Sequence, residues 1–481
     1  MTVPRSGPQV KYELLEENAR TAVKTSHLWS AVLFTILVIC SSVIGVYLAW
    51  QHMLGATKDG DNVDFLMIGP KKSYLASYQR SSHHRGAIYT DAILRMKTAN
   101  LSLPQMPARS KPRAESAQYK LVCYYSLPPS AHAYHPLTPD KLDPQLCTHI
   151  NIAFATVANG TISPTADGDV KEYKALVALK KKNPELKVIL SVEWFSSTGE
   201  FAWIVSTEEN RTRFVNNAVE FLTKHELDGL DIDWEFPSWP TVVQNQTSCF
   251  MELLRLLSER LHATVPPMTL SVAAGAPKQI IDQSYNITAM AEYIDFVNVM
   301  AYDYHMYQSY LPLTGANAPL YQRPAEQGVF TTLNTNWTAE YWLYKGMPIH
   351  KLIIGIPTYG HSFTLDNEAN HGWEAPSSGV GTVGTDGFVA YYDVCSFMTQ
   401  SNAQSVFDFE SKVPYAFRHK EWISFDNEQS VAYKAEFAKE QGFGGVMVFS
   451  LNTDDSDATC DGRTRFPLTQ RVRNVLQDDQ L

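Results

Sequence analysis

Three acidic residues alternate with large apolar residues in the stretch LDGLDIDWEFP, residues 227–237. If this stretch is a β-strand, Asp231, Asp233 and Glu235 share one face, because successive side chains of a strand point to opposite sides. Carboxyl groups gathered on one face suit general acid–base work, since a neighbouring like charge raises the affinity of one group for its proton. We therefore expect acid–base chemistry at this strand, with Glu235 nearest its carboxyl end.

A solvated acidic turn and a metal site are the two alternatives for these acids. A turn has no need for a strict period of two with Ile232 and Trp234 in between. Carboxylates are ligands that Ca²⁺ and Mg²⁺ accept, so metal binding stays open as the second alternative. The six cysteines lie too far apart for a C-x-x-C metal site. The pattern favours chemistry on a sugar, with no metal and no cofactor.

The elements that position these acids follow one another as eight short, β-rich apolar runs. Helix-period segments such as 210–226 separate several of them. This alternation predicts an α/β fold, a (β/α)8 TIM barrel, with a doubly wound open sheet as the alternative. No glycine-rich nucleotide loop follows any run, which weakens the nucleotide-binding forms of that alternative. The predicted strands are 120–126, 149–155, 186–192, 227–234, 268–274, 295–302, 351–357 and 444–450.

The gap between the seventh and eighth runs, 358–443, is too long for one helix and two loops. It contains the aromatic, turn-rich segments GFVAYYDVCSF and EWISFDN. We therefore predict a small α+β insertion at about 360–425, which would form a wall beside the carboxyl ends of the strands. The folded part as a whole is expected to span 119–470, with a tail at 471–481.

The N-terminal region contains a stretch of 23 residues without a charge, 28–50. A helix of that length covers a hydrocarbon core of about 30 Å. Basic residues lie mainly before it, which predicts a cytosolic tail at 1–27 and a transmembrane signal-anchor. The rest of a type II membrane protein then faces the lumen or the outside, with a poorly ordered stalk at 51–118. A cleaved signal peptide and secretion are the alternative.

Charge and glycosylation signals agree with an extracellular or lumenal sugar-binding protein. The formal net charge of −10 disfavours nucleic acid as a partner, because phosphate binding needs a surplus of Lys and Arg. A neutral sugar raises no such objection. N-x-S/T sequons follow the predicted span at Asn100, Asn159, Asn210, Asn245, Asn286 and Asn336.

The acidic motif resembles the D-G-x-D-x-D-W-E signature of family 18 glycoside hydrolases. Further motifs resemble those of the family's sixth, seventh and eighth strands, and the similarity extends over roughly 119–470. Their order and spacing resemble the animal chitinases and chitinase-like lectins, including the insertion. The matching positions are Asp228, Gly229, Asp231, Asp233, Trp234 and Glu235, then 300–303 (MAYD), 357–360 (PTYG) and 444–448 (GGVMV).

The resemblance implies a mechanism and a set of site residues. Glu235 would protonate the glycosidic oxygen, and the 2-acetamido oxygen of the substrate would attack the anomeric carbon. Asp233 would orient the acetamido group, with Asp231 beneath it as a proton-sharing partner and Tyr302 holding the acetamido oxygen. Core packing is the alternative for aromatic residues in the cleft. The residues implied in substrate binding are Tyr124, Phe154, Trp194, Met300, Asp303, Tyr359 and Phe449.

The resemblance also implies two disulfides, Cys123 with Cys147 and Cys395 with Cys460, which fit an oxidising compartment. Cys40 lies in the predicted span. Cys249 has no matching partner, and we expect a buried thiol there.

Departures from the family pattern concern the aromatic lining of the cleft. Glu193 stands where relatives carry glycine, and Pro128 takes the place of a tryptophan. Phe449 and Phe236 replace a tryptophan and a tyrosine, and a phenyl ring offers less stacking area than an indole. Two classes of function follow: a hydrolase of chitin or other N-acetylglucosamine-containing oligosaccharides, and a non-catalytic lectin on the same barrel. The intact acids favour the enzyme.

Overall fold

The computed structural model describes residues 119–127, 137–194, 199–240 and 242–478. The predicted cytosolic tail (1–27), membrane span (28–50) and stalk (51–118) lie outside the described residues, as do Cys40 and Asn100. Within the described ranges, no helix is both long enough and apolar enough to cross a membrane. The relation of the chain to a membrane therefore stays a prediction.

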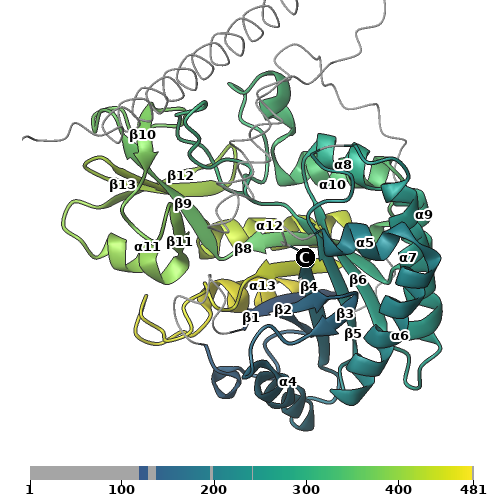
Figure 1. Ribbon diagram of the computed structural model, residues 1–481. Helices are drawn as coiled ribbons and strands as arrows, with labels where there is room; N and C mark the ends of the chain where they lie inside the picture. Colours follow the sequence, from purple (N-terminus) through teal and green to yellow (C-terminus); the bar gives the residue numbers. More distant parts are fainter. Residues whose placement is uncertain (1–118, 128–136, 195–198, 241, 479–481) are drawn as a thin grey trace, which may run out of the picture. The chain divides into compact units, whose positions relative to one another are not determined.

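Parallel strands form a closed barrel at the centre of the folded part (Figure 1). The first strand pairs with both the second and the last, which closes the ring. The (β/α)8 barrel is confirmed, and the open sheet is wrong. The barrel strands are β1 (Lys120–Ser126), β2 (His149–Ala158), β4 (Lys187–Trp194), β5 (Gly229–Trp234), β6 (Thr269–Gly275), β7 (Phe296–Met300), β8 (Leu352–Pro357) and β15 (Gly445–Phe449).

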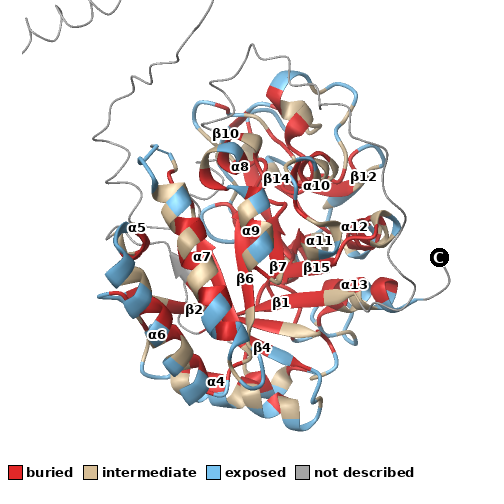
Figure 2. Ribbon diagram, turned by 90° about the vertical axis from the view of Figure 1, so that its right-hand side faces the viewer, coloured by how far each residue is buried: buried red, intermediate tan, exposed pale blue. Residues whose placement is uncertain are grey.

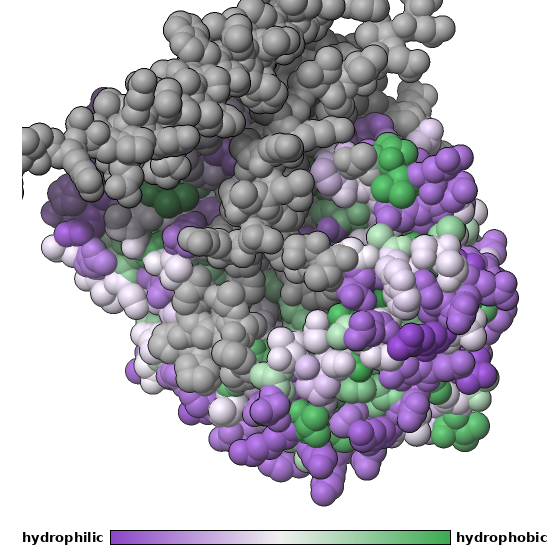
Figure 3. Space-filling model, in the orientation of Figure 1, coloured by the Kyte–Doolittle hydropathy of each residue, from purple (hydrophilic) through white to green (hydrophobic). Residues whose placement is uncertain are grey.

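Helices cover the outside of the barrel and bury one face each. In the helix at 208–224, Phe214, Val215, Ala218 and Leu222 are buried, which is the stripe expected from the 3.6-residue period. Figure 2 shows buried strands inside and exposed outer helix faces, and Figure 3 shows mainly hydrophilic residues over the helices at its right. The helices are α4 (Asp169–Ala178), α5 (Glu200–Ser206), α6 (Glu208–Lys224), α7 (Gln246–His262), α8 (Lys278–Ser284), α9 (Ile287–Tyr293), α10 (Thr335–Tyr344), α12 (Glu428–Gln441) and α13 (Pro467–Gln477).

The predicted insertion is a separate antiparallel sheet that begins directly after β8 (Figure 1, left). Its strand order is β10-β9-β14-β13-β12, and β11 pairs with β9. Phe363 and Trp422 pack in a small core on one face, and Val389 and Ile423 pack in another. The insertion is therefore confirmed. Its elements are β9 (Tyr359–Leu365), β10 (Ser377–Val380), β11 (Phe388–Ala390), α11 (Tyr391–Met398), β12 (Gln404–Asp408), β13 (Val413–Arg418) and β14 (Glu421–Ser424).

The C-terminal helix α13 runs past residue 470, where the folded part was predicted to end. Val472, Val475 and Leu476 are buried, and the polar positions between them face outward. An amphipathic helix of this kind is stabilised by the apolar surface it buries against the barrel. The folded part therefore extends at least to Gln477.

Both implied disulfides are present. Cys123–Cys147 joins β1 to the segment before β2, and Cys395–Cys460 joins α11 of the insertion to the segment between β15 and α13. Cys249, expected as a buried thiol, is free and half-buried in α7.

Replacing Cys395 and Cys460 together by serine should lower the free energy of unfolding by about 2–4 kcal/mol, because the bridge constrains the unfolded chain across a separation of 65 residues. Urea unfolding of the double variant measures this loss, and Cys249→Ser is the matched control with little change expected. Four free thiols at Cys123, Cys147, Cys395 and Cys460 in the native protein would contradict both pairings.

Candidate active site

Strand β5 carries the acids at alternating positions, as predicted. Asp231 reaches side chains of four other barrel strands, so it points into the barrel. Trp234 points the other way: it stacks on Phe201 of α5 with ring centres 5.5 Å apart and meets Phe250 of α7 edge-on at 5.3 Å. The alternation therefore separates an acidic inner face from an apolar outer face.

The first two positions of the motif fix β5 between its neighbours. Asp228 pairs with Lys180 at 2.7 Å and accepts the Val188 N–H at 2.8 Å, which ties it to the start of β4. Gly229 approaches β6 so closely that a Cβ there would lie 2.4 Å from the Thr269 carbonyl oxygen. Only glycine fits this approach. Asp228 and Gly229 thus set the position of the acids that follow.

The carboxylate of Asp231 is fully buried and surrounded by four hydrogen-bond donors. Tyr124 Oη and Ser191 Oγ each donate to Oδ2 at 2.7 Å. Ser271 Oγ donates to Oδ1 at 2.6 Å, and Asn298 Nδ2 donates to it at 3.3 Å. Burial raises the pKa of Asp231 above its ordinary value, while the four donors oppose that rise. The four donors therefore solvate this carboxylate in place of water.

Two tyrosines adjoin the acids. Burial raises the pKa of the Tyr124 hydroxyl, and the charges of Asp231 and Asp233 raise it further, so the hydroxyl stays a neutral donor. Burial likewise raises the pKa of Tyr285, and Glu235 and Asp233 add to the rise. Glu235 follows β5 directly and is partly exposed, whereas Asp233 is buried. Glu235 is thus the acid of this face that opens to the barrel mouth.

The aromatic residues predicted for the cleft meet around Phe449, the last residue of β15. Its ring centre lies 5.4 Å from that of Tyr124, 6.0 Å from that of Tyr302 and 6.3 Å from that of Tyr359. Phe154 extends the cluster, with its ring centre 6.4 Å from that of Tyr124. Predicted residues from β1, β2, β9 and β15 and from the segment after β7 therefore form one aromatic cluster beside the acids.

The remaining predicted contacts are only partly described. Met300 is buried at the carboxyl end of β7. Trp194 ends β4 and pairs in register with Trp234, but the side chains of Trp194 and Glu193 lie outside what the structure describes, and so does Pro128.

A second acidic group, Asp303, lies in the segment after β7. Its Oδ1 accepts the Tyr359 hydroxyl at 2.7 Å and lies 2.8 Å from Nε2 of His361. Its backbone N–H donates to Asn317 Oδ1 at 2.9 Å, and Asn317 Nδ2 donates to the Tyr359 carbonyl at 3.0 Å. Asp303 thereby connects the segment after β7 to the first strand of the insertion.

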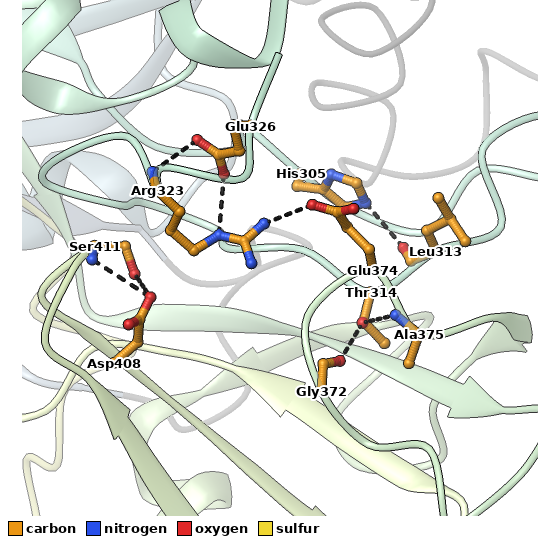
Figure 4. A network of polar contacts seen from close by, with 10 residues as sticks. All are labelled: His305, Leu313, Thr314, Arg323, Glu326, Gly372, Glu374, Ala375, Asp408 and Ser411. Carbon is orange, nitrogen blue, oxygen red and sulfur yellow. Dashed lines mark hydrogen bonds and ion pairs between the residues drawn. The ribbon is translucent and has the colours of Figure 1, made fainter.

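A polar network joins the same segment to the rest of the insertion (Figure 4). Arg323 donates to Glu374 at 2.8 Å and to Glu326 at 3.1 Å. The His305 ring lies 2.8 Å from the Leu313 carbonyl, and its burial lowers the pKa of His305 to about 4, so it is neutral at physiological pH. The Arg323–Glu374 pair thus connects the segment after β7 to the insertion, and the other two contacts lie within that segment.

Several residues of this site were not singled out from the sequence. Ser271 and Asn298 are polar residues at inward positions of otherwise apolar strands, and His361 lies two positions after Tyr359 on the same face of β9. A period of two from Met300 and from Tyr359 was the available signal for Asn298 and His361. The missed residues are Ser191, Ser271, Tyr285, Asn298, Asn317 and His361.

The barrel, its insertion and the acidic strand define a class of protein. Residues 120–454 match the family described as Glycosyl hydrolases family 18. The chain belongs to this family.

Its relatives include proteins named as chitinases and one described as a pseudo-chitinase. The chain is 37% identical to mouse chitotriosidase-1 over 348 residues, covering 70% of this chain and 74% of that one. A solved structure of human YKL-39, described as a pseudo-chitinase with retained chitooligosaccharide binding, shares 33% identity with a TM-score of 0.69 over 75% of this chain and all of that one. The Ostrinia furnacalis Group IV chitinase shares 32% identity with the same TM-score and coverage.

Ser271→Ala should lower the free energy of unfolding by about 1.5–3 kcal/mol, because it removes a donor to a buried carboxylate. Because the pKa of Asp231 is raised, its carboxyl group stays protonated in the folded protein at pH values where it has ionised in the unfolded chain. The contribution of Asp231 to the free energy of unfolding therefore declines as pH rises. The donor favours the ionised form, and the loss should therefore be larger near pH 8 than near pH 4. Denaturant unfolding at both pH values measures it.

Ser284→Ala is the matched control, since the Ser284 hydroxyl is buried and bonds to none of the described residues. Its effect should be small and independent of pH. A pH-independent loss in Ser271→Ala would contradict the role of Ser271 as a donor to the Asp231 carboxylate.

Proposed function

We propose that this protein hydrolyses β-1,4-linked N-acetylglucosamine glycans by substrate-assisted, retaining catalysis. The observation that carries the proposal is the inner face of β5, where Asp231, Asp233 and Glu235 succeed one another toward the barrel mouth. Chemistry in this fold takes place at the carboxyl ends of the strands, and Glu235 is the acid nearest that end.

In the first step Glu235 donates its proton to the glycosidic oxygen, and the bond from that oxygen to the anomeric carbon breaks. The acetamido oxygen of the substrate forms a new bond to the same carbon, so no enzyme carboxylate is needed as nucleophile. Water then attacks the anomeric carbon, breaks that new bond and returns a proton to Glu235. The configuration at the anomeric carbon is retained after the two displacements.

Asp233 and Tyr302 orient the acetamido group in this proposal. Positive charge develops on that group as its oxygen attacks, and a buried carboxylate at Asp233 stabilises it more than water would. Tyr302 lies in the aromatic cluster around Phe449, with its hydroxyl 3.9 Å from Met447 Sδ. Asp231, held by its four donors, is the fixed partner beneath Asp233.

The lining residues bind the sugar. Phe154, which is partly exposed, offers a ring face to the apolar face of a pyranose ring, and the buried rings of Tyr359 and Phe449 lie behind it. Asp303 and Met300 lie beside them at and just after the end of β7. Trp194 is assigned to the same role from its place at the end of β4.

A non-catalytic lectin on the same barrel is the second candidate function. The observation that favours it is the enclosure of Phe449 by Tyr124, Tyr302 and Tyr359, which leaves the residue only 5% exposed. A small, enclosed ring at the floor of the cleft weakens stacking on a substrate sugar.

We also propose that the catalytic domain faces the lumen or the outside of the cell, anchored by a span at 28–50. Support comes from the uncharged stretch with basic residues before it and from two disulfides, which persist in oxidising compartments.

Glu235→Gln should lower the rate of hydrolysis of N-acetylchitooligosaccharides by about 10²–10⁴, because the amide keeps the shape of the side chain but has no acidic proton to give. Binding should survive. Rates and affinities are measured for wild type, Glu235→Gln and the exposed control Glu208→Gln. A wild type that binds these sugars but cleaves none establishes the lectin, and a Gln variant as fast as wild type refutes the role of Glu235.

Protease added to sealed microsomes should leave residues 119–478 intact and remove only the N-terminal tail, because the membrane shields a lumenal domain. The fragment is detected with an antibody to the barrel, before and after detergent. Digestion of the barrel without detergent, or a mature secreted chain that begins after the predicted span, would rule out the anchored topology.

A further inference from the structure

A tight hairpin joins β2 to the short strand β3 (Thr161–Ser163). Ala158 pairs with Thr161 directly, so the turn consists of Asn159 and Gly160 alone. Both have positive φ, at 51° and 68°. Asn-Gly with positive φ at both positions is the sequence that two-residue hairpins of the type I′ kind prefer. The tip of this hairpin is therefore a rigid, well-defined surface feature.

The same tip is an N-glycosylation sequon, Asn159-Gly160-Thr161. Asn159 is exposed, and its side chain hydrogen-bonds to none of the described residues. Among the described residues, the Thr161 hydroxyl bonds only to the Ala158 carbonyl, at 2.8 Å. Both side chains that glycosylation needs are thus accessible in the folded protein.

Two other sequons of the described part, those of Asn210 and Asn336, are less open, whereas Asn245 and Asn286 are exposed as Asn159 is. The threonine of the Asn336 sequon, Thr338, is fully buried, and its hydroxyl lies 2.7 Å from that of Tyr304. Nδ2 of Asn210, the atom that would carry a sugar, donates to the Trp203 carbonyl at 2.9 Å. Asn159 combines exposure with a turn that presents its side chain outward.

An exposed tryptophan lies against this turn. Trp203 of α5 is 41% exposed, which is unusual for so large an apolar side chain. The edge of its six-membered ring packs on Gly160, where a Cβ would lie 2.4 Å from Cζ3. The ring is therefore fixed beside Asn159 while much of its surface stays open to solvent.

We propose that Asn159 carries an N-linked glycan whose first N-acetylglucosamine stacks on Trp203. In the modification, Asn159 Nδ2 forms a bond to the anomeric carbon of a lipid-pyrophosphate-linked oligosaccharide, loses one proton, and displaces the lipid pyrophosphate. The inference rests on the lumenal placement proposed above and is separate from the catalytic assignment.

The stacking follows from the shapes and polarities of the two groups. A pyranose ring has one face of C–H groups that water solvates poorly, and an indole offers the largest flat apolar surface of any side chain. The sugar is attached one residue from the contact between Trp203 and Gly160, so little conformational freedom is lost when the two faces meet. The glycan covers an apolar surface that the protein alone leaves in water.

The first test is occupancy in the full chain produced in a eukaryotic secretory pathway. Glycopeptide mass spectrometry should find Asn159 modified and Asn336 unmodified. Glycans at Asn245 or Asn286 with none at Asn159 would overturn this inference alone. A chain without any glycan would overturn both the glycan at Asn159 and the lumenal placement. Hydrolysis by Glu235 is assayed separately and does not depend on the glycan.

The second test is a double-mutant cycle on the contact between sugar and ring. Thr161→Val abolishes the sequon with little change of shape, and Thr161→Ser preserves it as the matched control. Thr161→Val also removes the hydrogen bond to the Ala158 carbonyl, so it should lower the Tm by about 2 °C more when Trp203 is present than in a Trp203→Ala background. An equal shift in both backgrounds, or the same shift in protein made in bacteria without glycans, shows that the glycan does not stack on Trp203.

Discussion

A carboxylate that is removed from water has to be solvated by the protein, and this requirement organises the barrel interior. The donors to Asp231 come from β1, β4, β6 and β7, so they converge on one point only when the ring is closed and every strand is in register. A slip of one residue in any of these strands would turn its donor away from the acid. The strand register that closes the barrel is therefore the same register that places the four donors around Asp231.

The sequence predicted features that repeat within a short stretch. The period of two in 227–237 placed Asp231 inside and Trp234 outside, and eight apolar runs predicted the barrel strands. It did not identify Ser271 or Asn298 as partners of Asp231, because they lie 40 and 67 residues away and a polar residue in an apolar strand has no visible partner until the strands are assembled. The disulfides and the cleft residues came from resemblance to a family.

Hydrolysis and binding make different demands on this site. Binding needs aromatic ring faces and a wall beside them. Hydrolysis needs in addition an acid at the mouth whose proton reaches the glycosidic oxygen. Members of one family can therefore share a cleft and differ in chemistry through a few side chains, as the coexistence of chitinases and a pseudo-chitinase among the relatives illustrates.

The insertion leaves and rejoins the chain at nearly the same place. Its first strand β9 follows β8 after a single residue, and its last strand β14 pairs with β9, with Ser424 opposite His361. A module whose two ends are adjacent can be lengthened, trimmed or exchanged during evolution without altering the order or register of the barrel strands. Changes in the insertion can therefore alter what stands beside the carboxyl ends of the strands without moving the inner face of β5.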